Sequence, residues 1–305
     1  MIFIKNITKQ FPTVTALENF SLTIHRGEFF GLLGPNGAGK STLMSLLVGY
    51  LDPDGGEIFF DKEKITRDSL QSRKTIGLVP QSLALYEDLS ALSNLEIFGS
   101  FFHIEKKILH ERIEEKLHAV QLFDRRKDKV KTFSGGMKRR LNLVASLLHE
   151  PEILLCDEPT VGVDPQSRNA IFDYLQSLNK QGKTIVYTTH YMEEVERLCN
   201  RIAIIDAGKV IAEGSIDVLL HKLAVDETIS IVRNAVTVEK KNIFEQFGAV
   251  IEKEDRLEVT PHAGFLLSQF FIAMEEHHIN YQFIDIHKPT LEDLFLFLTG
   301  RSLRD

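Results

Sequence analysis

The sequence predicts an α/β protein in which a largely parallel β-sheet is interrupted by a helical insertion and followed by a small α+β domain. Short apolar segments alternate with helical segments along the first 225 residues, as in sheets built from strand–helix–strand units. Between residues 90 and 150 the apolar residues recur with helical spacing. After residue 225 short strands and helices follow one another in a different order, which indicates a second domain.

The first third of the chain predicts mainly strands. Strand-like segments occupy residues 1–7, 19–25, 27–34, 57–61 and 75–81. The segment 27–34 is almost entirely apolar and ends in glycine, which is typical of a buried strand. A helix is expected from Lys40 to about residue 51, and the Asp-Pro-Asp-Gly-Gly sequence at 52–56 predicts the turn that ends it.

Helices and buried strands fill the middle of the chain. The clearest helical stretches are residues 89–102 and 113–123. Residues 152–157, 183–189 and 201–207 are short apolar segments that predict strands. A helix is expected from Pro165 to about Lys180, because Asp164 suits the capping position and proline suits the first turn.

The last 80 residues predict a small α+β domain. Strands are expected over 227–233, 249–260 and 279–287, and helices over 242–247 and 263–276. A final helix, 290–298, has Thr290 as its cap, Asp293 three residues later and Gly300 as its stop. From residue 226 the chain carries 8 basic and 14 acidic residues, which is either a solvated acidic face or a mark of a dimer-stabilising or regulatory module.

Composition excludes several classes of protein. The chain has 305 residues, 43% of them hydrophobic and 26% charged, as in a globular protein. The net charge of −7 argues against nucleic acid as the main partner. Two cysteines cannot form a disulfide scaffold, so a reducing compartment is expected. The longest apolar stretch, 265–274, is too short to span a membrane, and the N-terminus does not match a signal peptide.

A glycine-rich segment follows the strand expected at 27–34 and precedes the helix that begins at Lys40. It matches the phosphate-loop pattern G-x-x-x-x-G-K-[ST]. Glycines let backbone N–H groups point at phosphate oxygens, Lys40 suits the β- and γ-phosphates, and the Ser41 hydroxyl can bind Mg²⁺. The alternative is a glycine-rich turn that binds nothing, but the position between strand and helix favours a nucleotide site. The candidate nucleotide-binding residues here are Gly34, Pro35, Asn36, Gly37, Ala38, Gly39, Lys40, Ser41 and Thr42.

Two acidic residues end the apolar strand expected at 152–157. In an α/β sheet this end of a strand lies beside bound phosphates. We expect Asp157 to hold Mg²⁺ through water, and Glu158 to polarise the water that attacks ATP. The alternative is a pair of solvated acids at the end of a strand.

A third motif resembles that of a known family. Residues 133–140, Phe-Ser-Gly-Gly-Met-Lys-Arg-Arg, resemble the signature motif of ABC-transporter ATPases, usually Leu-Ser-Gly-Gly-Gln. Gln81, Asp164 and His190 fall where that family has its glutamine loop, its dimer-contact aspartate and its switch histidine. The resemblance implies a P-loop NTPase core, with a RecA-like parallel sheet, an antiparallel β subdomain and a helical insertion at about 85–150. The resemblance covers about residues 1–215. Together with the shift in charge and in element order near residue 225, it gives an ATPase domain, 1–225, and an accessory C-terminal domain, 226–305.

The resemblance also implies how the site works. ABC ATPases act as head-to-tail pairs, so Ser134, Gly135 and Gly136 should contact the γ-phosphate of ATP held by the partner. A helix that begins at these residues would offer free N–H groups to an anion. His190 would contact the γ-phosphate of the same chain's ATP, and Gln81 would contact Mg²⁺ or water. Asp164 would lie at the contact between the two copies.

Phe11 and two departures from the family pattern complete the site prediction. Phe11 lies where the family places the aromatic ring that stacks on adenine, although a buried core phenylalanine is the alternative. Phe133 replaces the usual leucine, and Met137 replaces the usual glutamine. Neither change removes the Ser-Gly-Gly core, but methionine cannot donate the hydrogen bonds of glutamine.

The resemblance implies the ATP-hydrolysing subunit of a membrane transporter. The segment that follows Gln81 and the final 289–300 resemble type-2 exporter ATPases, a drug-resistance group whose permease is a separate chain. ATP and Mg²⁺ are the implied cofactors, and a second copy or a related ATPase subunit is the implied partner. The implied location is the cytoplasmic face of the plasma membrane, bound through the permease. An importer ATPase, a non-transport ABC ATPase of DNA repair or the ribosome, and a small-molecule kinase are the alternatives.

Overall fold

The computed structural model describes residues 1–221, 228–262 and 264–300. These residues form two compact units, 1–216 and 217–300. The boundary predicted at residue 225 lies outside the described residues. Each unit has its own apolar core.

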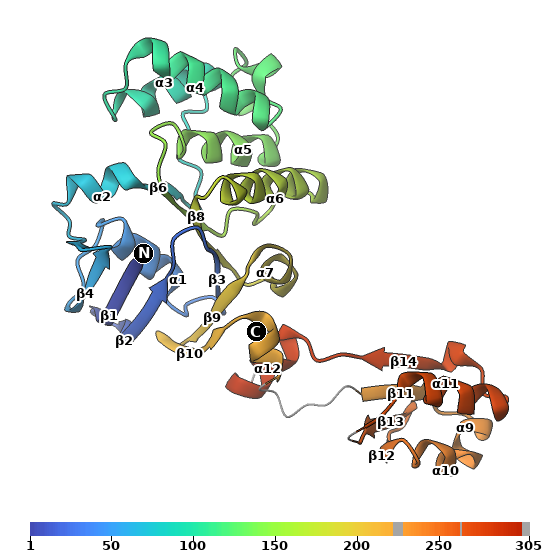
Figure 1. Ribbon diagram of the computed structural model, residues 1–305. Coiled ribbons are helices and arrows are strands. Elements are labelled where there is room, and N and C mark those ends of the chain that lie inside the picture. Colours follow the sequence, from blue (N-terminus) through green and yellow to red (C-terminus); the bar gives the residue numbers. More distant parts are fainter. Residues whose placement is uncertain (222–227, 263, 301–305) are drawn as a thin grey trace. The chain divides into compact units, whose positions relative to one another are not determined.

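A six-stranded, mostly parallel sheet forms the centre of the first unit (Figure 1). Its order is β10-β9-β3-β8-β7-β6, and only β10 runs antiparallel to its neighbour. The strands are β3 Phe29–Leu33, β6 Ile76–Val79, β7 Ile153–Asp157, β8 Thr184–Thr189, β9 Arg201–Asp206 and β10 Lys209–Gly214. Every residue of β3, β7 and β8 is buried, as expected for parallel strands covered on both faces. The predicted strands at 27–34, 75–81, 152–157, 183–189 and 201–207 are confirmed.

An antiparallel sheet of order β2-β1-β4-β5 accompanies it. The strands are β1 Ile2–Phe11, β2 Val14–Ile24, β4 Gly55–Phe60 and β5 Glu63–Lys64. The first two strands are longer than the predicted segments 1–7 and 19–25 and form a hairpin. The sequence did not predict the extension because several of the added residues, such as Gln10 and Thr15, are polar and exposed and interrupt the apolar pattern.

Seven helices and two short 3₁₀ turns complete the described part of the first unit, and α8 crosses its boundary. They are α1 Lys40–Leu47, α2 Leu70–Thr75, α3 Ala91–Ser100, α4 Lys106–Ala119, η1 Phe123–Arg125, η2 Val130–Thr132, α5 Gly135–Ala145, α6 Pro165–Lys180, α7 Met192–Leu198 and α8 Ile216–His221. The helices α3, α4 and α5 share an apolar core and form the predicted insertion (Figure 1). The prediction that α1 reaches residue 51 is wrong, because Gly49 adopts a positive φ of 67° and ends the helix.

The second unit is an antiparallel sheet of order β12-β13-β11-β14 with helices between its strands. Its elements are β11 Thr228–Val232, α9 Ala235–Glu239, α10 Lys241–Phe244, β12 Gly248–Glu252, β13 Arg256–Pro261, α11 Leu267–Glu276, η3 Tyr281–Phe283, β14 Ile284–His287 and α12 Leu291–Thr299. This order is the β-α-β-β-α-β arrangement of ferredoxin-like domains, followed by α12. The single strand predicted over 249–260 is wrong, since residues 253–255 turn the chain into a hairpin.

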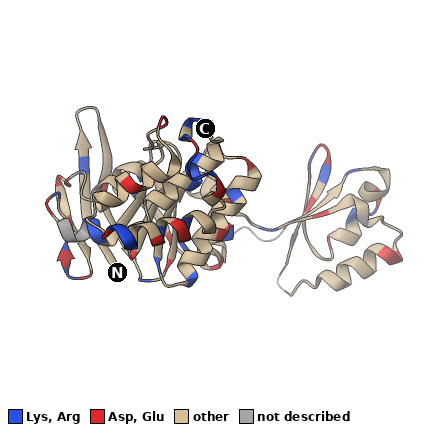
Figure 2. Ribbon diagram, turned by 90° about the horizontal axis from the view of Figure 1, so that it is seen from above, with Lys and Arg blue, Asp and Glu red and all other residues tan. Residues whose placement is uncertain are grey.

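The predicted cap of the last helix is confirmed. Thr290 and Asp293 bond each other's backbone N–H groups, and Gly300 adopts a φ of 72° after the last turn. Across the described residues, no helix has both the length and the apolar character needed to cross a bilayer. Acidic and basic positions are interspersed along both units (Figure 2).

Candidate active site

The phosphate loop connects β3 to α1 at the carboxyl end of the parallel sheet. Gly39 precedes α1 with a φ of 105°, and a side chain there would lie 2.5 Å from the carbonyl oxygen of Ala16. Only glycine fits this position. The helix begins at Lys40, so its unpaired N–H groups and its positive dipole face the loop.

A cavity of about 390 Å³ lies over this loop. Its lining residues are Phe11, Val14, Ala16, Asn36, Gly37, Gly39, Lys40, Ser41, Thr42, Gln81 and Glu158. The structure therefore brings most of the predicted nucleotide residues together with the predicted base. Phe11 is 40% exposed, so its ring is not part of the core, and Lys9 Nζ lies 5.9 Å from its centre.

Lys40 is held inside the loop. Its Nζ donates to the carbonyl oxygens of Gly34, at 2.7 Å, and Pro35, at 3.0 Å. The same atom lies 3.2 Å from Glu158 Oε1. Both charged residues are only 4% exposed. A buried ammonium in a loop of inward-turned N–H groups is suited to bind phosphate oxygens.

Glu158 is the centre of the site. Gln81 Nε2 donates to its Oε2 at 2.9 Å, and His190 Nδ1 lies 3.4 Å from its Oε1. Glu158 adopts a positive φ of 45°, which is uncommon for a residue with a side chain and is frequent at functional sites. Its backbone N–H donates to Thr188 Oγ1 at 2.9 Å, which fixes this turn.

Asp157, at the end of β7, lies beside the cavity rather than in its lining. Its Oδ1 accepts a hydrogen bond from Thr188 Oγ1 at 2.7 Å. Among the residues that the structure describes, no three His, Cys, Asp or Glu side chains form a metal-binding group. Any metal here would rely on oxygen atoms of Ser41, Gln81 and Asp157, together with those of a bound phosphate.

The signature residues form a second cluster. Ser134 caps α5, its Oγ accepting from the N–H of Met137 at 3.3 Å. Gly136 packs against α6, where a side chain would lie 2.2 Å from Ser167 Oγ and 3.1 Å from Asp164 Oδ2. Hydrogen bonds from Ser167, the strongest of them from its backbone N–H, lower the pKa of Asp164. The Asp164 carboxylate that caps α6 therefore stays ionised.

None of the signature residues lines the phosphate-loop cavity of the same chain. The exposed ends of α5 and α6, with Gly135 near Gly162, form one surface instead. The predicted site residues thus fall into two groups. The first group lies around the phosphate loop, and Ser134, Gly135, Gly136 and Asp164 make up the second.

Sequence reasoning missed two parts of the site. Val14 and Ala16 line the cavity but belong to the unpredicted end of the first hairpin. A buried polar network centred on Glu194 lies behind Glu158 and His190. The sequence carries no pattern for this network, because its hydroxyl groups and its carboxylate come from separate segments of the chain.

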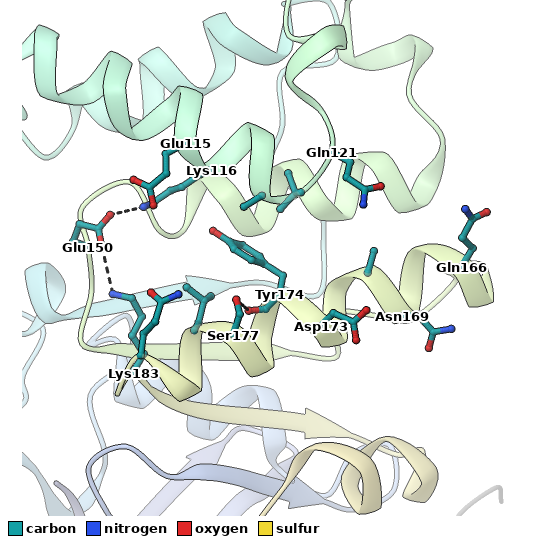
Figure 3. A pocket seen from close by; sticks show the side chains of 15 residues that line it. Glu115, Lys116, Gln121, Glu150, Gln166, Asn169, Asp173, Tyr174, Ser177 and Lys183 are labelled. Atoms are coloured by element: carbon teal, nitrogen blue, oxygen red, sulfur yellow. Dashed lines mark hydrogen bonds and ion pairs between the residues drawn. The ribbon is translucent and has the colours of Figure 1, made fainter.

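A larger cavity, of about 490 Å³, contains none of the predicted site residues (Figure 3). It lies between α4 and α6, and Tyr174 and Asp173 project toward it. At one end the Glu150 carboxylate joins Lys116 of the insertion to Lys183 of the core. The ion pairs at this cavity connect the helical insertion to the core, and no phosphate-loop residue lines it.

Known proteins resemble this chain in sequence and in structure. A family model described as ABC transporter matches residues 17–161. The chain is 42% identical to the linearmycin resistance ATP-binding protein LnrL of Bacillus subtilis (strain 168), over 100% of both chains. It is 37% identical to the daunorubicin resistance ATP-binding protein DrrA3 of Streptomyces coeruleorubidus, over 99% of this chain and 97% of that protein. It is 38% identical to the Nod factor export ATP-binding protein I of Cupriavidus pinatubonensis, over 99% of this chain and 91% of that protein.

Solved structures of cassettes are similar to the first unit. The dimeric structure of MJ0796, a bacterial ABC transporter cassette, has a TM-score of 0.65 and 31% identity, over 70% of this chain and 98% of that chain. A dimeric post-hydrolysis state of MJ0796 bound to ADP and Pi has the same TM-score and 30% identity. The phosphate loop, the acidic strand end and the full-length relatives agree: the chain belongs to the ATP-binding proteins of ABC transporters and is the ATP-hydrolysing subunit of an exporter.

Proposed function

We propose that two copies of this chain clasp two ATP molecules and so drive a separate membrane permease. The ATP-hydrolysing part of this proposal is supported most directly by the surroundings of Glu158. Its carboxylate lies 3.2 Å from Lys40, 2.9 Å from Gln81 and 3.4 Å from His190, beside a cavity lined by the phosphate loop. A base, a phosphate-binding cation and two polar side chains thus converge where a γ-phosphate would lie.

Hydrolysis follows from this arrangement. The β- and γ-phosphates replace Glu158 as the charge partner of Lys40, and the carboxylate then accepts a proton from water. The water oxygen bonds to the γ-phosphorus as the bond to the bridging oxygen breaks, giving ADP and phosphate. His190 contacts the γ-phosphate, so the site responds to its loss.

Mg²⁺ fits the donor set of the site. This ion prefers oxygen ligands and keeps several waters. Ser41 offers a hydroxyl oxygen, and Gln81 offers its amide oxygen, since its nitrogen already donates to Glu158. Asp157 lies behind the cavity lining and would act through water. When bound, Mg²⁺ neutralises charge on the β- and γ-phosphate oxygens.

The signature residues complete the site of the partner copy. Ser134, Gly135 and Gly136 begin α5 with free N–H groups, which suit an anion. They lie outside their own chain's nucleotide cavity, which is consistent with a contact made across a dimer. ATP then binds the closed pair better than the separate chains, and hydrolysis reverses this preference.

A groove next to Gln81 suits the permease. It has a volume of about 530 Å³, and its lining includes Pro80 and Ala84, on either side of Gln81 along the chain. Phe98 and Tyr50, the latter 72% exposed, contribute aromatic surface. Core and insertion both contribute to this groove, so nucleotide-driven changes at Gln81 reach a docked partner directly.

We infer the cargo class from the relatives. Two of them are named for antibiotic resistance and one for Nod factor export. Export of an antibiotic or a similar secreted small molecule is the corresponding role here, with the permease selecting the molecule. The chain would work at the cytoplasmic face of the plasma membrane, attached through that permease.

The decisive variant is Glu158→Gln. The amide cannot accept the proton from water, so we expect hydrolysis to fall about 10²- to 10⁴-fold while ATP binding persists. Light scattering at saturating ATP and Mg²⁺ should then show a stable dimer. Glu152→Gln, at an exposed acid just before the same strand, should behave as the native chain. A Glu158→Gln protein that stays monomeric would contradict this proposal.

A further inference from the structure

A buried polar network lies behind the candidate active site. Its centre is Glu194, in the first turn of α7, which is only 2% exposed. Its carboxylate accepts three hydrogen bonds from hydroxyl groups. Thr160 Oγ1 donates to Oε1 at 2.7 Å, and Tyr187 Oη and Thr189 Oγ1 donate to Oε2 at 2.9 and 2.8 Å.

Two of these donors belong to the loops that carry the candidate catalytic groups. Thr160 lies two residues after Glu158, and it is 2% exposed. Thr189 immediately precedes His190, and its Oγ1 also accepts from the N–H of Tyr191 at 2.9 Å. The Thr189 hydroxyl therefore bonds both to Glu194 and to the backbone of the residue that follows His190. The Glu194 carboxylate is thus bonded to both loops, and the side chains of His190 and Glu158 on these loops lie 3.4 Å apart.

Tyr187 provides a natural comparison. It lies within β8 and is fully buried, and its Oη lies 3.1 Å from Thr160 Oγ1, so it supports the Thr160 side of the network from the sheet rather than from either loop. Burial and the nearby Glu194 carboxylate raise the pKa of Tyr187, so its phenol stays protonated and remains a donor. In the described part of the chain, the cation paired with Glu194 is Arg168, whose Nε lies 3.9 Å from Oε1 without a hydrogen bond.

We infer that Glu194 is a positioning residue, whose hydrogen bonds fix the Glu158 loop and the His190 loop relative to each other for hydrolysis. This inference rests on the proposed roles of Glu158 and His190. A carboxylate is suited to this task because it accepts several hydroxyl hydrogen bonds at once, and such charge-assisted bonds are strong. Reacting groups must be placed to within a fraction of an ångström, and a misplacement of about 1 Å can cost 10²-fold in rate.

The test removes one hydroxyl at a time. Thr189→Val and Thr160→Val keep the shape of the side chain but cut one loop from Glu194. Each should lower kcat for ATP hydrolysis by the full chain about tenfold, with KM for ATP within twofold, because the phosphate loop and Phe11 are untouched. Tyr187→Phe removes a donor from the same carboxylate but keeps the direct bonds of Thr160 and Thr189 to Glu194, so it should lower kcat less than either threonine variant. Glu193→Gln, at the exposed neighbouring acid, is the surface control.

A second measurement separates positioning from general loss of structure. Thr189→Val combined with Glu158→Gln should hydrolyse ATP no more slowly than Glu158→Gln alone, because residues that act as a unit are not additive. A variant that merely unfolds the protein would lower both rates in proportion. All rates are compared per mole of total protein, at one temperature.

Two results would overturn the inference while leaving the proposed function intact. One is a Thr189→Val enzyme with native kcat when Glu158→Gln has lost hydrolysis. The other is a Tyr187→Phe enzyme that loses as much kcat as Thr189→Val. Native hydrolysis by Glu158→Gln itself would instead overturn the proposed function, and the inference with it.

Discussion

At the residue scale, two adjacent glycines of the signature meet different surroundings. A side chain at Gly136 would lie 2.2 Å from Ser167 Oγ and 2.3 Å from Ser167 Cβ. Outside its chain neighbours and the backbone of its own helix, a side chain at Gly135 would come no closer than 3.8 Å to a heavy atom, the oxygen of Gly162. Gly136 is therefore required by packing within the chain, whereas nothing in the chain itself requires Gly135.

Gly136→Ala should destabilise the protein by about 1–3 kcal/mol, because the added methyl group forces α5 away from α6. Gly135→Ala should leave the free energy of unfolding unchanged or slightly raised, since alanine favours the helix. Denaturant unfolding of the two variants measures this difference.

The same pair also tests the dimer contact. In the Glu158→Gln background, Gly135→Ala should prevent ATP-dependent association even though the protein is natively stable, because the methyl group meets the partner's nucleotide. Equal stability of the two variants would contradict the packing argument. Normal association of the Gly135→Ala protein would contradict the placement of the signature against the partner.

At the element scale, the sequence predicted best where burial or a cap fixes the element. The fully buried strands of the parallel sheet, and helix α12 with its capping box, lie where apolar runs and cap residues indicated. The ends of β1 and β2 were missed because several of their residues, such as Gln10 and Thr15, are polar and exposed. The hairpin within 249–260 was missed because its turn, residues 253–255, contains neither glycine nor proline.

The residues of the candidate site likewise divide into those that the sequence predicted and those that it did not. The phosphate loop, Asp157 and Glu158 were readable because a local motif needs particular residue types at fixed spacing. The Glu194 network was not readable, because Thr160, Tyr187 and Glu194 come together only through tertiary packing. A buried carboxylate has no sequence pattern of its own, and its hydroxyl partners are common residues.

Glu150 joins helix α4 of the insertion to the segment that precedes β8. Its carboxylate pairs with Lys116 of α4, which is 5% exposed, and lies 3.5 Å from Lys183 Nζ before β8 (Figure 3). Glu150→Gln leaves a buried ammonium without its charge partner. We expect a loss of about 1–3 kcal/mol, below the value for a fully buried pair because Glu150 is partly exposed.

Thermal unfolding measures this loss, which corresponds to a fall in Tm of roughly 2–10 °C for a unit of this size. Glu115→Gln is the matched control, since Glu115 lines the same cavity but forms no ion pair among the described residues. If both variants lose the same stability, the bridge between insertion and core has no special role.

The Asp61 side chain connects the end of β4 to the residues just before β1 and just after β2 in the antiparallel sheet. It follows β4, and hydrogen bonds from Arg26 and from the amino group of Met1 lower the pKa of Asp61 to about 2. Because the folded pKa lies below the unfolded one, the stabilisation is complete above pH 4 to 5 and is lost as the pH falls toward 2.

Asp61→Asn should therefore be less stable than the native chain at pH 7, by less than about 1 kcal/mol because the pair is exposed. Urea midpoints of the two proteins, measured between pH 6 and pH 2, should converge as the pH falls through the unfolded and then the folded pKa of Asp61. A difference that stays constant or widens as the pH falls would show that Asp61 does not stabilise the sheet through its charge.

At the scale of the whole molecule, the chain has separate apolar cores for its two units. Solved cassettes such as MJ0796 match 70% of this chain with 98% of their own length, so the first unit corresponds to a complete cassette. All predicted nucleotide residues lie in that unit. Nucleotide binding should therefore stabilise one core and leave the other unchanged.

Calorimetry of the full chain should show two unfolding transitions, of which only one responds to ADP. At an ADP concentration of about 100 times Kd, the first unit gains about 2.7 kcal/mol, which raises its Tm by roughly 5–10 °C. Phe270→Ala identifies the other transition, because Phe270 is fully buried in the core of the second unit and its truncation costs about 3–5 kcal/mol. That variant should lower the ADP-insensitive transition alone. A single cooperative transition, or two that shift together with ADP, would mean that the C-terminal unit is energetically part of the ATPase rather than an accessory to it.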